Sequence, residues 1–402
     1  MSDPFETLGI RAIVNGYGPV TRFGGGAMAA EVSEAMRAAT AHSVDIPELQ
    51  AAASKVIAEA TGAEAGIVTS GASAAILVGT AACLTGMDPG KMNRLPDTRG
   101  MRNEIVVVRS QRNSYDHAMR AAGAILVEVG LADRYTGAGV RDAEPWEIRD
   151  AITEKTCAVY YLARPESLPP LRQVAAVAHE AGLPVIVDAA AELPPMGNLQ
   201  RFIAEGADLV AFSGGKAIGG PQGAGILCGK RSLVGAALLQ QLDLDYAVDE
   251  WEPPASLIDR RNLPGLPRHG IGRSCKVGKE EVVGVLTALR LFTREGDKGR
   301  HDRLKAAGDA LVAALGNLPR LHAGIIADPD GTGMPMVELK LDQNGAGLDS
   351  DRLLSKLRGG SPRIEIIPWK PHEGRLLVNL SCLRSGDPAL IAGRLKEIVG
   401  AD

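Results

Sequence analysis

The stretch PVIVDAAAELPPMGNLQRFIAEGADLVAFSGGKAIGGPQGAGILCG (residues 184–229) decides the fold. It contains three short apolar runs, PVIVD, DLVAFS and GILCG. Runs that are apolar at nearly every position are typical of strands covered on both faces. The first two runs are separated by room for one helix, which predicts parallel strands. The Gly-rich connection before the third run leaves no room for a helix, so we expect an antiparallel strand there.

Four earlier runs extend the same pattern: AGIVTS (65–70), EIVVVR (104–109), AILVEV (124–129) and CAVYYL (157–162). Longer Ala- and Leu-rich segments with helical character lie between them. Alternation of this kind predicts an α/β domain with a mostly parallel, seven-stranded sheet wrapped by helices.

The pattern changes after about Arg273. Residues 279–318 predict a long amphipathic helix that breaks near Gly296. Short strand-like runs follow it: HAGIIA (322–327), MVELKL (336–341), RIEIIP (363–368) and RLLVNLS (375–381). We therefore expect a smaller α+β domain. The predicted division is an N-terminal segment (1–45) associated with the small domain, a large domain (46–275), and a linking helix with the small C-terminal domain (276–402).

The composition excludes several classes of function. A formal net charge of −4 over 402 residues disfavours a general nucleic-acid surface. The five cysteines form no CxxC pair, and the seven histidines form no HExxH motif, so neither a disulfide framework nor a catalytic metal is expected. Neither a signal peptide nor a membrane span is recognisable, which favours a cytoplasmic protein.

Two residues in the opening stretch predict chemistry. Asp188 ends a buried apolar strand, where open α/β sheets place their ligands. Lys216 follows the next strand and should reach the same edge of the sheet. A desolvated lysine is suited to imine formation, and a carboxylate beside it can pair with the pyridine nitrogen of pyridoxal 5′-phosphate (PLP). Taken singly, an Asp at a strand end is most often a helix cap or a surface residue, and a Lys in a Gly-rich turn is usually solvated. The pair at this spacing favours a PLP site.

A phosphate-binding turn is predicted between a strand and an Ala-rich helix. There, Ser70, Gly71, Ala72 and Ser73 offer backbone N–H groups and two hydroxyls to an anion. Ser213 adds a further hydroxyl near Lys216. The alternative is a simple serine N-cap. Neither a P-loop motif nor an early GxGxxG motif occurs in the sequence.

Five segments together resemble a known enzyme family: VNGYGPVTRFGGGAM (14–28), TGAEAGIVTSGASAA (61–75), NSYDHAM (113–119), FSGGKAIGGPQGAGILCGK (212–230) and GRSCKVGKEE (272–281). They are similar to the selenocysteine synthase and D-glucosaminate-6-phosphate ammonia-lyase group. The resemblance runs in order from about Ile13 to Leu286. It implies an aminotransferase-like PLP fold of type I.

The resemblance also implies roles for residues of this sequence. Lys216 would bind PLP as a Schiff base, Asp188 would contact the pyridine nitrogen, and the turn at 70–73 would bind the phosphate. His117 would lie near the face of the ring, although Tyr115 could take that place. For both, a capping, core or surface position is the alternative.

Cationic side chains are expected to bind the substrate. Arg273 and Lys276 belong to a helix-start block that resembles the family's, and they are expected to face an active site, either their own or that of a neighbouring subunit. Arg384 lies late in the small domain, where a fold-type-I enzyme places an arginine for a carboxylate. Thr21 and Arg22 are further candidates. A solvated surface position is the alternative for the first three of these residues.

The expected reaction is α,β-elimination from a small, hydroxylated amino acid, through an external aldimine and a quinonoid, with Lys216 as the general base. A racemase, epimerase or aldolase remains the alternative, because it shares the same first step. Selenium transfer onto aminoacyl-tRNA is disfavoured by the negative charge, by Gly215 where the selenium enzymes carry Asp before the lysine, and by the early start of the VNGYG segment. A PLP-fold binding protein without activity is a further alternative. A homodimer or larger homo-oligomer is expected.

Overall fold

The computed structural model describes residues 4–131, 142–247, 249–343 and 348–400. The chain divides into a larger compact unit, Ala29–Thr293, and a smaller one formed by Met1–Met28 and Arg294–Asp402. Each unit is described by itself. The domain boundaries expected at residues 45 and 275 stay a prediction.

The larger unit contains a seven-stranded sheet with strand order β2-β8-β7-β6-β5-β3-β4. Every one of the seven predicted strands is confirmed to within a residue or two. Their bounds are β2 Ala65–Thr69, β3 Glu104–Val108, β4 Ile125–Val129, β5 Thr156–Leu162, β6 Val185–Asp188, β7 Leu209–Ser213 and β8 Gly225–Gly229.

Strand direction follows the connections that the sequence allows. Strands β3, β4, β5, β6 and β7 pair in parallel, each reached through a helical crossover. The short Gly-rich connection from β7 to β8 makes β8 antiparallel to β7 and to β2, as predicted. In the register of β6 and β7, Asp188 lies opposite Ala211. The end of β6 and the residues that follow β7 therefore lie at the same edge of the sheet.

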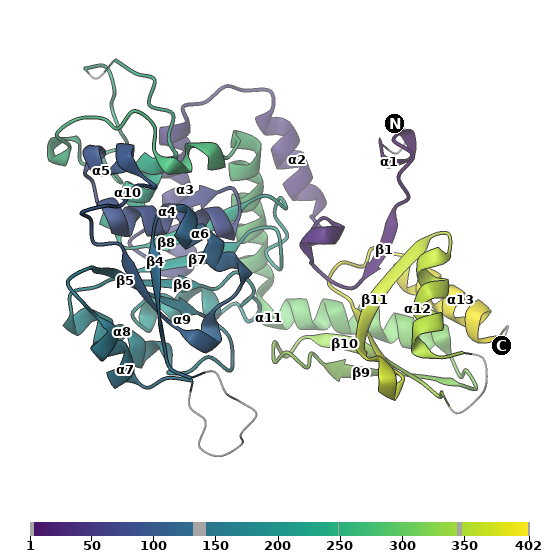
Figure 1. Cartoon of the computed structure of the whole chain (residues 1–402). Helices are drawn as coiled ribbons and strands as arrows, with labels where there is room; N and C mark the ends of the chain where they lie inside the picture. The colour runs from purple at the N-terminus through teal and green to yellow at the C-terminus, as the bar shows by residue number, and fades with distance from the viewer. Residues whose placement is uncertain (1–3, 132–141, 248, 344–347, 401–402) are drawn as a thin grey trace. The chain divides into compact units, whose positions relative to one another are not determined.

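Helices cover both faces of this sheet (Figure 1). One face packs against α3, α7, α8, α9 and the first part of α11, and the other against α4, α5, α6 and α10. Because the strands are apolar at successive positions, they supply side chains to both cores. The helices are α2 Ala30–Ala39, α3 Ile46–Thr61, α4 Ala72–Thr85, α5 Pro89–Arg94, α6 His117–Ala121, α7 Pro145–Ala151, α8 Leu171–Glu180, α9 Asn198–Ala204, α10 Arg231–Gln241 and α11 Lys279–Leu315.

Helix α11 is interrupted at Gly296, whose φ of 65° and ψ of 175° are not helical. A glycine adopts this positive φ without the steric cost that a side chain would bring. The predicted break in the long helix is thereby confirmed. The division between the two compact units, after Thr293, falls close to it.

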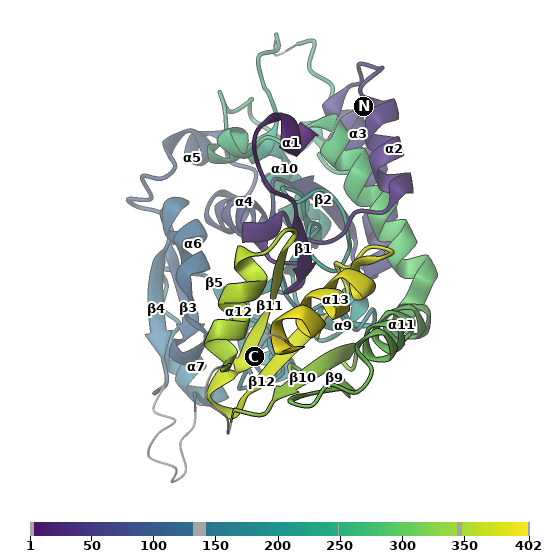
Figure 2. The same cartoon turned by 90° about the vertical axis from the view of Figure 1, so that its right-hand side faces the viewer.

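The smaller unit is built on a five-stranded sheet with order β1-β11-β12-β10-β9. Strand β1 pairs in parallel with β11, so residues 13–16 belong to the small sheet. Helix α2, which lies in the same predicted segment, belongs to the larger unit, and the association of residues 1–45 with the small domain stays a prediction. Figure 2 shows α12 and α13 beside this sheet, and leucines of both helices join its core. The elements are α1 Pro4–Thr7, β1 Ile13–Gly16, β9 Leu321–Ala327, β10 Pro335–Leu341, α12 Ser350–Gly359, β11 Arg363–Lys370, β12 Arg375–Asn379 and α13 Asp387–Gly400.

Within the described part of the chain, no helix has both the length and the apolar character that crossing a membrane requires.

Candidate functional site

Asp188 is held at the end of β6 by two hydrogen bonds. Its side chain is buried, with 4% of the residue exposed. One carboxylate oxygen accepts a hydrogen bond from the backbone N–H of Ala190 at 3.0 Å, and the other accepts one from the Tyr160 hydroxyl at 3.1 Å. Tyr160 comes from the neighbouring strand β5. The carboxyl group therefore has a fixed orientation at the edge where β6 ends.

Lys216 follows β7 and is half-buried at the same edge of the sheet. Burial lowers the pKa of its amine, and the charge of Asp188 partly opposes this shift. Burial likewise raises the pKa of the Asp188 carboxyl, against the Ala190 N–H, the Tyr160 hydroxyl and the Lys216 charge. Among the described residues, no side chain forms a hydrogen bond or ion pair with the Lys216 amine. The two groups are thus near neighbours without a direct ion pair.

The loop that carries Lys216 requires glycine. A Cβ on Gly215 would lie 2.5 Å from the backbone of Gln222, and one on Gly214 would lie 2.5 Å from the Val285 side chain. Hydrogen bonds from Gly214 N–H to the Ala224 carbonyl and from Gly220 N–H to the Gly214 carbonyl close this turn at 2.9 Å each. Close backbone packing therefore fixes where the lysine side chain begins.

The predicted phosphate turn lies at the start of α4. Gly71 has a φ of 89° and precedes the first helical residue, Ala72, so the first N–H groups of the helix lack intrahelical acceptors. Ser73 is exposed, and its hydroxyl is available to a ligand. The Ser70 hydroxyl instead donates to the carbonyl of Cys275 at 2.9 Å.

This turn is pressed against β8. A Cβ on Gly225 would lie 2.3 Å from the Gly71 carbonyl carbon. The turn therefore lies beside the strand that follows the Lys216 loop. The roles proposed for Ser70, Gly71, Ala72, Ser73 and Ser213 in PLP binding stay predictions.

His117 and Tyr115 both lie on the surface. His117 begins α6 and is exposed, and Tyr115 is 58% exposed. In the part of the chain that the structure describes, neither side chain is recorded in contact with Asp188 or Lys216. Their assignment to the ring face stays a prediction.

Arg273 and Lys276 lie on either side of the residue that binds Ser70. Both follow α10, in and just after a 3₁₀ turn at Ile271–Cys275. Arg273 forms an ion pair with Asp243 at 2.6 Å, whereas the Lys276 side chain is exposed. The hydrogen bond from Ser70 to Cys275 ties this segment to the start of α4, which is consistent with a position near an anion.

The remaining predicted substrate residues belong to the smaller unit. The Arg22 guanidinium lies 4.3 Å from the ring centroid of Tyr17 and 4.6 Å from that of Phe23. Thr21 and Arg384 are exposed. Contact of these side chains with a substrate stays a prediction.

The sequence analysis missed two residues that lie near Asp188. Tyr160 supplies the hydroxyl that binds Asp188. Two adjacent tyrosines, Tyr160 and Tyr161, stand in this buried strand of a chain with only 3% aromatic residues, but the local pattern does not show which of them reaches Asp188. Glu192 follows β6 and raises the pKa of Lys216 through its charge. It lies four residues after Asp188, but nothing in the local pattern sets it apart.

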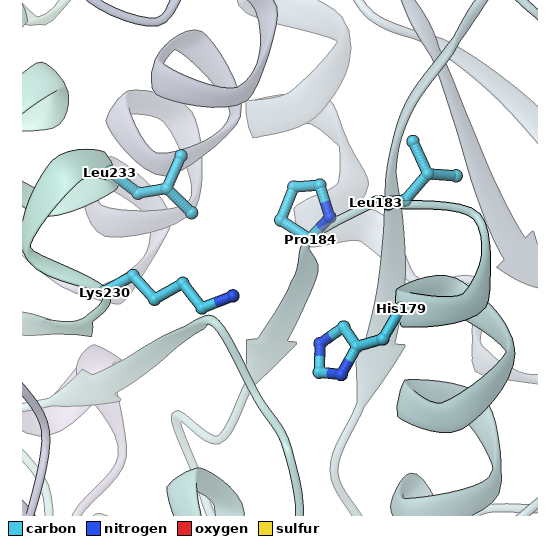
Figure 3. Close-up of a pocket in the computed structure, with 6 residues that line it drawn as sticks. His179, Leu183, Pro184, Lys230 and Leu233 are labelled. Atoms are coloured by element: carbon cyan, nitrogen blue, oxygen red, sulfur yellow. The ribbon is translucent and has the colours of Figure 1, made fainter.

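A second charged cluster occupies the opposite edge of the sheet, where β6 and β7 begin. Asp208, 1% exposed, forms an ion pair with Lys230 at 2.5 Å and a hydrogen bond with His179 at 2.8 Å, and it accepts the Val185 N–H at 2.7 Å. His179 and Lys230 line a cavity of about 300 Å³ together with Leu183, Pro184 and other residues (Figure 3). Every polar group of this aspartate is satisfied by the protein, which indicates a structural role.

One group of potential metal ligands occurs among the described residues. Single ligand atoms of Asp243, Asp245 and His269 lie within 4.8 Å of one another, and all three residues are exposed. Asp243 already binds Arg273, and His269 lies 3.2 Å from Asp245. Exposed acidic groups of this kind are common without a metal ion, and the expectation of no catalytic metal stays a prediction.

The fold and the site define a class of protein. A solved structure of D-glucosaminate-6-phosphate ammonia-lyase matches over 100% of both chains, with a TM-score of 0.82 and 28% sequence identity. The fold is therefore the type-I fold of PLP-dependent enzymes, as predicted.

The sequence places the chain within one family of that class. Residues 25–251 match the family described as "SelA: L-seryl-tRNA selenium transferase". A 5′-C-glycyluridine monooxygenase-decarboxylase of Streptomyces sp is 32% identical, covering 98% of this chain and 92% of that protein. A D-glucosaminate-6-phosphate ammonia lyase of Salmonella typhimurium is 29% identical, covering 98% and 97%. The chain belongs to this selenocysteine-synthase-like family of PLP enzymes, which confirms the predicted resemblance and an enzymatic function.

Proposed function

We propose that the chain is a PLP-dependent lyase that removes ammonia from a small, hydroxylated amino acid by α,β-elimination. One observation carries this proposal: a lysine amine without an ion-pair partner lies beside a buried, oriented carboxyl at one edge of the sheet. A protein whose only use for the pair was stability would gain from joining the two groups directly. The full-length similarity to an ammonia lyase supports the reaction class.

The residues present fit PLP. The cofactor needs an amine for its aldehyde, an anion for its pyridine nitrogen and a cup of N–H donors for its phosphate. Lys216, Asp188 and the start of α4 supply these three groups. The amide oxygen of Gln222, in the turn packed against Gly215, is buried without a hydrogen-bond partner among the described residues. An unsatisfied buried acceptor leaves a hydrogen bond that a bound molecule could supply.

Each group then has a separate task. When bound, PLP supplies an aldehyde for covalent attachment and an electron-poor ring that delocalises the electrons left at the substrate Cα. Asp188 would hold a proton at the pyridine nitrogen, with the Tyr160 hydroxyl keeping the carboxylate in place. Ser73 and the first N–H groups of α4 would bind the phosphate. Lys216, with its pKa lowered by burial, would take the proton from Cα.

The reaction can be tested on the purified protein loaded with PLP. D- and L-serine, D- and L-threonine and D-glucosaminate form the substrate panel, and ammonia and keto acid are measured. Release of both in equal amounts from one member is the expected result. A protein that binds PLP and releases no ammonia from any of them contradicts elimination.

Oxidative decarboxylation is the second candidate. The relative that is 32% identical is a monooxygenase-decarboxylase. Consumption of oxygen together with release of carbon dioxide would favour this reaction. Exchange of the Cα proton for solvent deuterium without product would instead favour the racemase or epimerase alternative, and an aldehyde product would favour the aldolase alternative.

The partners follow from the same proposal. A small amino acid is the substrate, and the net charge of −4 opposes a tRNA partner. A gel shift with bulk tRNA tests selenium transfer. A homodimer or larger oligomer and a cytoplasmic location remain part of the proposal, and sedimentation of the holoenzyme tests the first of these.

A further inference from the structure

A second carboxyl group lies at the edge where β6 ends. The chain turns directly after Asp188, and the N–H of Glu192 donates to the Ala189 carbonyl at 3.2 Å. The carbonyl of Glu192 accepts a hydrogen bond from the buried side chain of Asn198 at 2.7 Å. The backbone of Glu192 is therefore held from both sides, and its side chain starts from a fixed point.

The Glu192 carboxyl has no partner of its own. Its side chain is half-buried, and no described residue forms a hydrogen bond or ion pair with it. The cations nearby are engaged elsewhere, since Arg164 lies 3.9 Å from Glu166 and Arg201 lies 3.0 Å from Glu205. A carboxyl that is partly withdrawn from water and left unpaired is costly to ionise.

Five charged residues act on this carboxyl. Arg164 and Glu166 follow β5, Asp188 ends β6, Arg201 lies on α9 and Lys216 follows β7. Burial has the largest effect and raises the pKa of Glu192 to about 7, with Glu166 and Asp188 adding to the shift and Arg164 and Arg201 opposing it. The group can therefore give up or accept a proton near neutral pH.

Elimination from a hydroxy-amino acid needs two proton transfers. One group must take the proton from Cα, and another must give a proton to the departing oxygen, because hydroxide is a poor leaving group. The proposed function uses Lys216 for the first transfer. Asp188 cannot serve for the second, since its carboxylate is committed to the pyridine nitrogen, and a general acid should titrate near the working pH.

We propose that Glu192 is the general acid that protonates the leaving hydroxyl. The inference rests on the proposed function. Lys216 takes the Cα proton, the electron pair left at Cα forms the new bond to Cβ, and the Cβ–O bond breaks. The oxygen keeps that bonding pair, accepts the Glu192 proton and leaves as water. Glu192 becomes a carboxylate and regains a proton from solvent before the next turnover.

The leaving group provides the test. Chloride departs without a proton, so a general acid is dispensable for β-chloroalanine and needed for serine. The PLP-loaded Glu192→Gln variant is compared with wild type on serine of the accepted configuration and on β-chloroalanine of the same configuration. We expect kcat for serine to fall by about 100-fold or more, within the range for general acid catalysis, and kcat for β-chloroalanine to stay within about threefold. Glu180→Gln, which removes an exposed carboxyl of α8 that is paired with Arg149, is the matched control and should leave both rates unchanged.

Each outcome decides between defined alternatives. An equal loss on both substrates, or no loss on either, overturns the general-acid role while the proposed function stands. A wild type that binds PLP and releases ammonia from no member of the substrate panel overturns the proposed function, and the role of Glu192 with it.

A second readout needs no turnover. Because burial raises the pKa of Glu192 from 4.5 to about 7, the folded protein keeps a proton that the unfolded chain has lost in this window. The free energy of unfolding of the cofactor-free wild type should therefore fall, relative to Glu192→Gln, as the pH rises from 4.5 to 7. Urea unfolding at pH 5 and pH 8 measures this difference. A difference that is independent of pH overturns the proposal.

Discussion

Two buried aspartates occupy opposite ends of neighbouring strands, and the protein treats them differently. Asp208, where β7 begins, is joined directly to Lys230 and His179 and also accepts a backbone N–H. Asp188, where β6 ends, binds a tyrosine hydroxyl and a backbone N–H, and the lysine near it remains unpaired. One aspartate has its charge neutralised by the protein itself. The other keeps a charge that a ligand can use.

The comparison suggests a division of roles, with stabilising ion pairs at one edge of the sheet and reactive groups at the other. At the edge where the strands begin, satisfied charges close the end of the sheet and need no ligand. At the edge where the strands end, three ionisable groups lie near one another without direct ion pairs: Asp188, Lys216 and Glu192. Open α/β sheets bind ligands at this edge because the loops there are free to vary without disturbing the strands. Paired substitutions at the two edges can therefore test whether function lies at one edge and stability at the other.

The largest difference in rate is expected between substitutions of the two lysines, Lys216 and Lys230. Lys216→Ala should lower ammonia release by about 1000-fold or more, since both covalent attachment and the general base are lost. Lys230→Ala should leave the rate within about threefold, because its amine is bound to Asp208 at the other edge. Borohydride reduction followed by peptide mass analysis should find PLP on Lys216 in wild type and in Lys230→Ala. Reduction that attaches PLP to Lys230 in wild type would reverse the two assignments.

Substitution of Asp188 should lower mainly the reaction rate, whereas substitution of Asp208 should lower mainly the free energy of unfolding. Asp188→Asn removes the anion opposite the pyridine nitrogen and should lower the rate by about 100-fold, within the range measured for catalytic electrostatic groups. Asp208→Ala leaves the Val185 N–H without its acceptor and should lower the free energy of unfolding by about 2–4 kcal/mol. Urea unfolding and ammonia release are measured on both variants. A large loss of stability in Asp188→Asn, with the rate intact, contradicts the division between the edges.

Tyr160 tests whether the orientation of Asp188 matters. Tyr160→Phe removes the hydroxyl that donates to the carboxylate and keeps the ring in the core. We expect the rate to fall by about tenfold, the worth of one hydrogen bond to a charged group. Loss of this donor also removes an influence that lowers the pKa of Asp188. His179→Phe is the matched change at Asp208, and it should lower stability with the rate unchanged. Equal rates for wild type and Tyr160→Phe would remove Tyr160 from the site.

Site residues could be predicted from the sequence when the local sequence pattern alone determines their position in the sheet. Strand ends follow from apolar runs, and parallel pairing brings the ends of β6 and β7 to one edge, so Asp188 and Lys216 were found together. Tyr160 was missed because strand register, not local pattern, places its hydroxyl against Asp188. Glu192 was missed because its position depends on a turn fixed by Asn198. The partner of Ser70 lies 205 residues away in the sequence, beyond any local rule.

Ser70 and Ser73 differ in whether their hydroxyl group is available to bind a phosphate. A hydroxyl has a single proton to donate, and that of Ser70 is committed to the Cys275 carbonyl. Ser73 is exposed and has its proton free for a ligand. Ser73→Ala should therefore weaken PLP binding by about fivefold, the worth of about 1 kcal/mol for one hydrogen bond. Ser70→Ala should change PLP affinity by less than about twofold.

Ser70→Ala should instead lower the stability of the protein. The Cys275 carbonyl also accepts from the Gln241 side chain at 3.1 Å, so the substitution does not leave it without a donor. The free energy of unfolding should then fall by only about 0.5–1 kcal/mol, the lower half of the range for a hydrogen bond. PLP titration and urea unfolding of both variants measure the two effects. The contrary result is that Ser70→Ala weakens PLP binding as much as Ser73→Ala does. The Ser70 hydroxyl must then leave the Cys275 carbonyl for the phosphate when PLP binds. In that case the turn would couple cofactor binding to the position of the segment that carries Arg273.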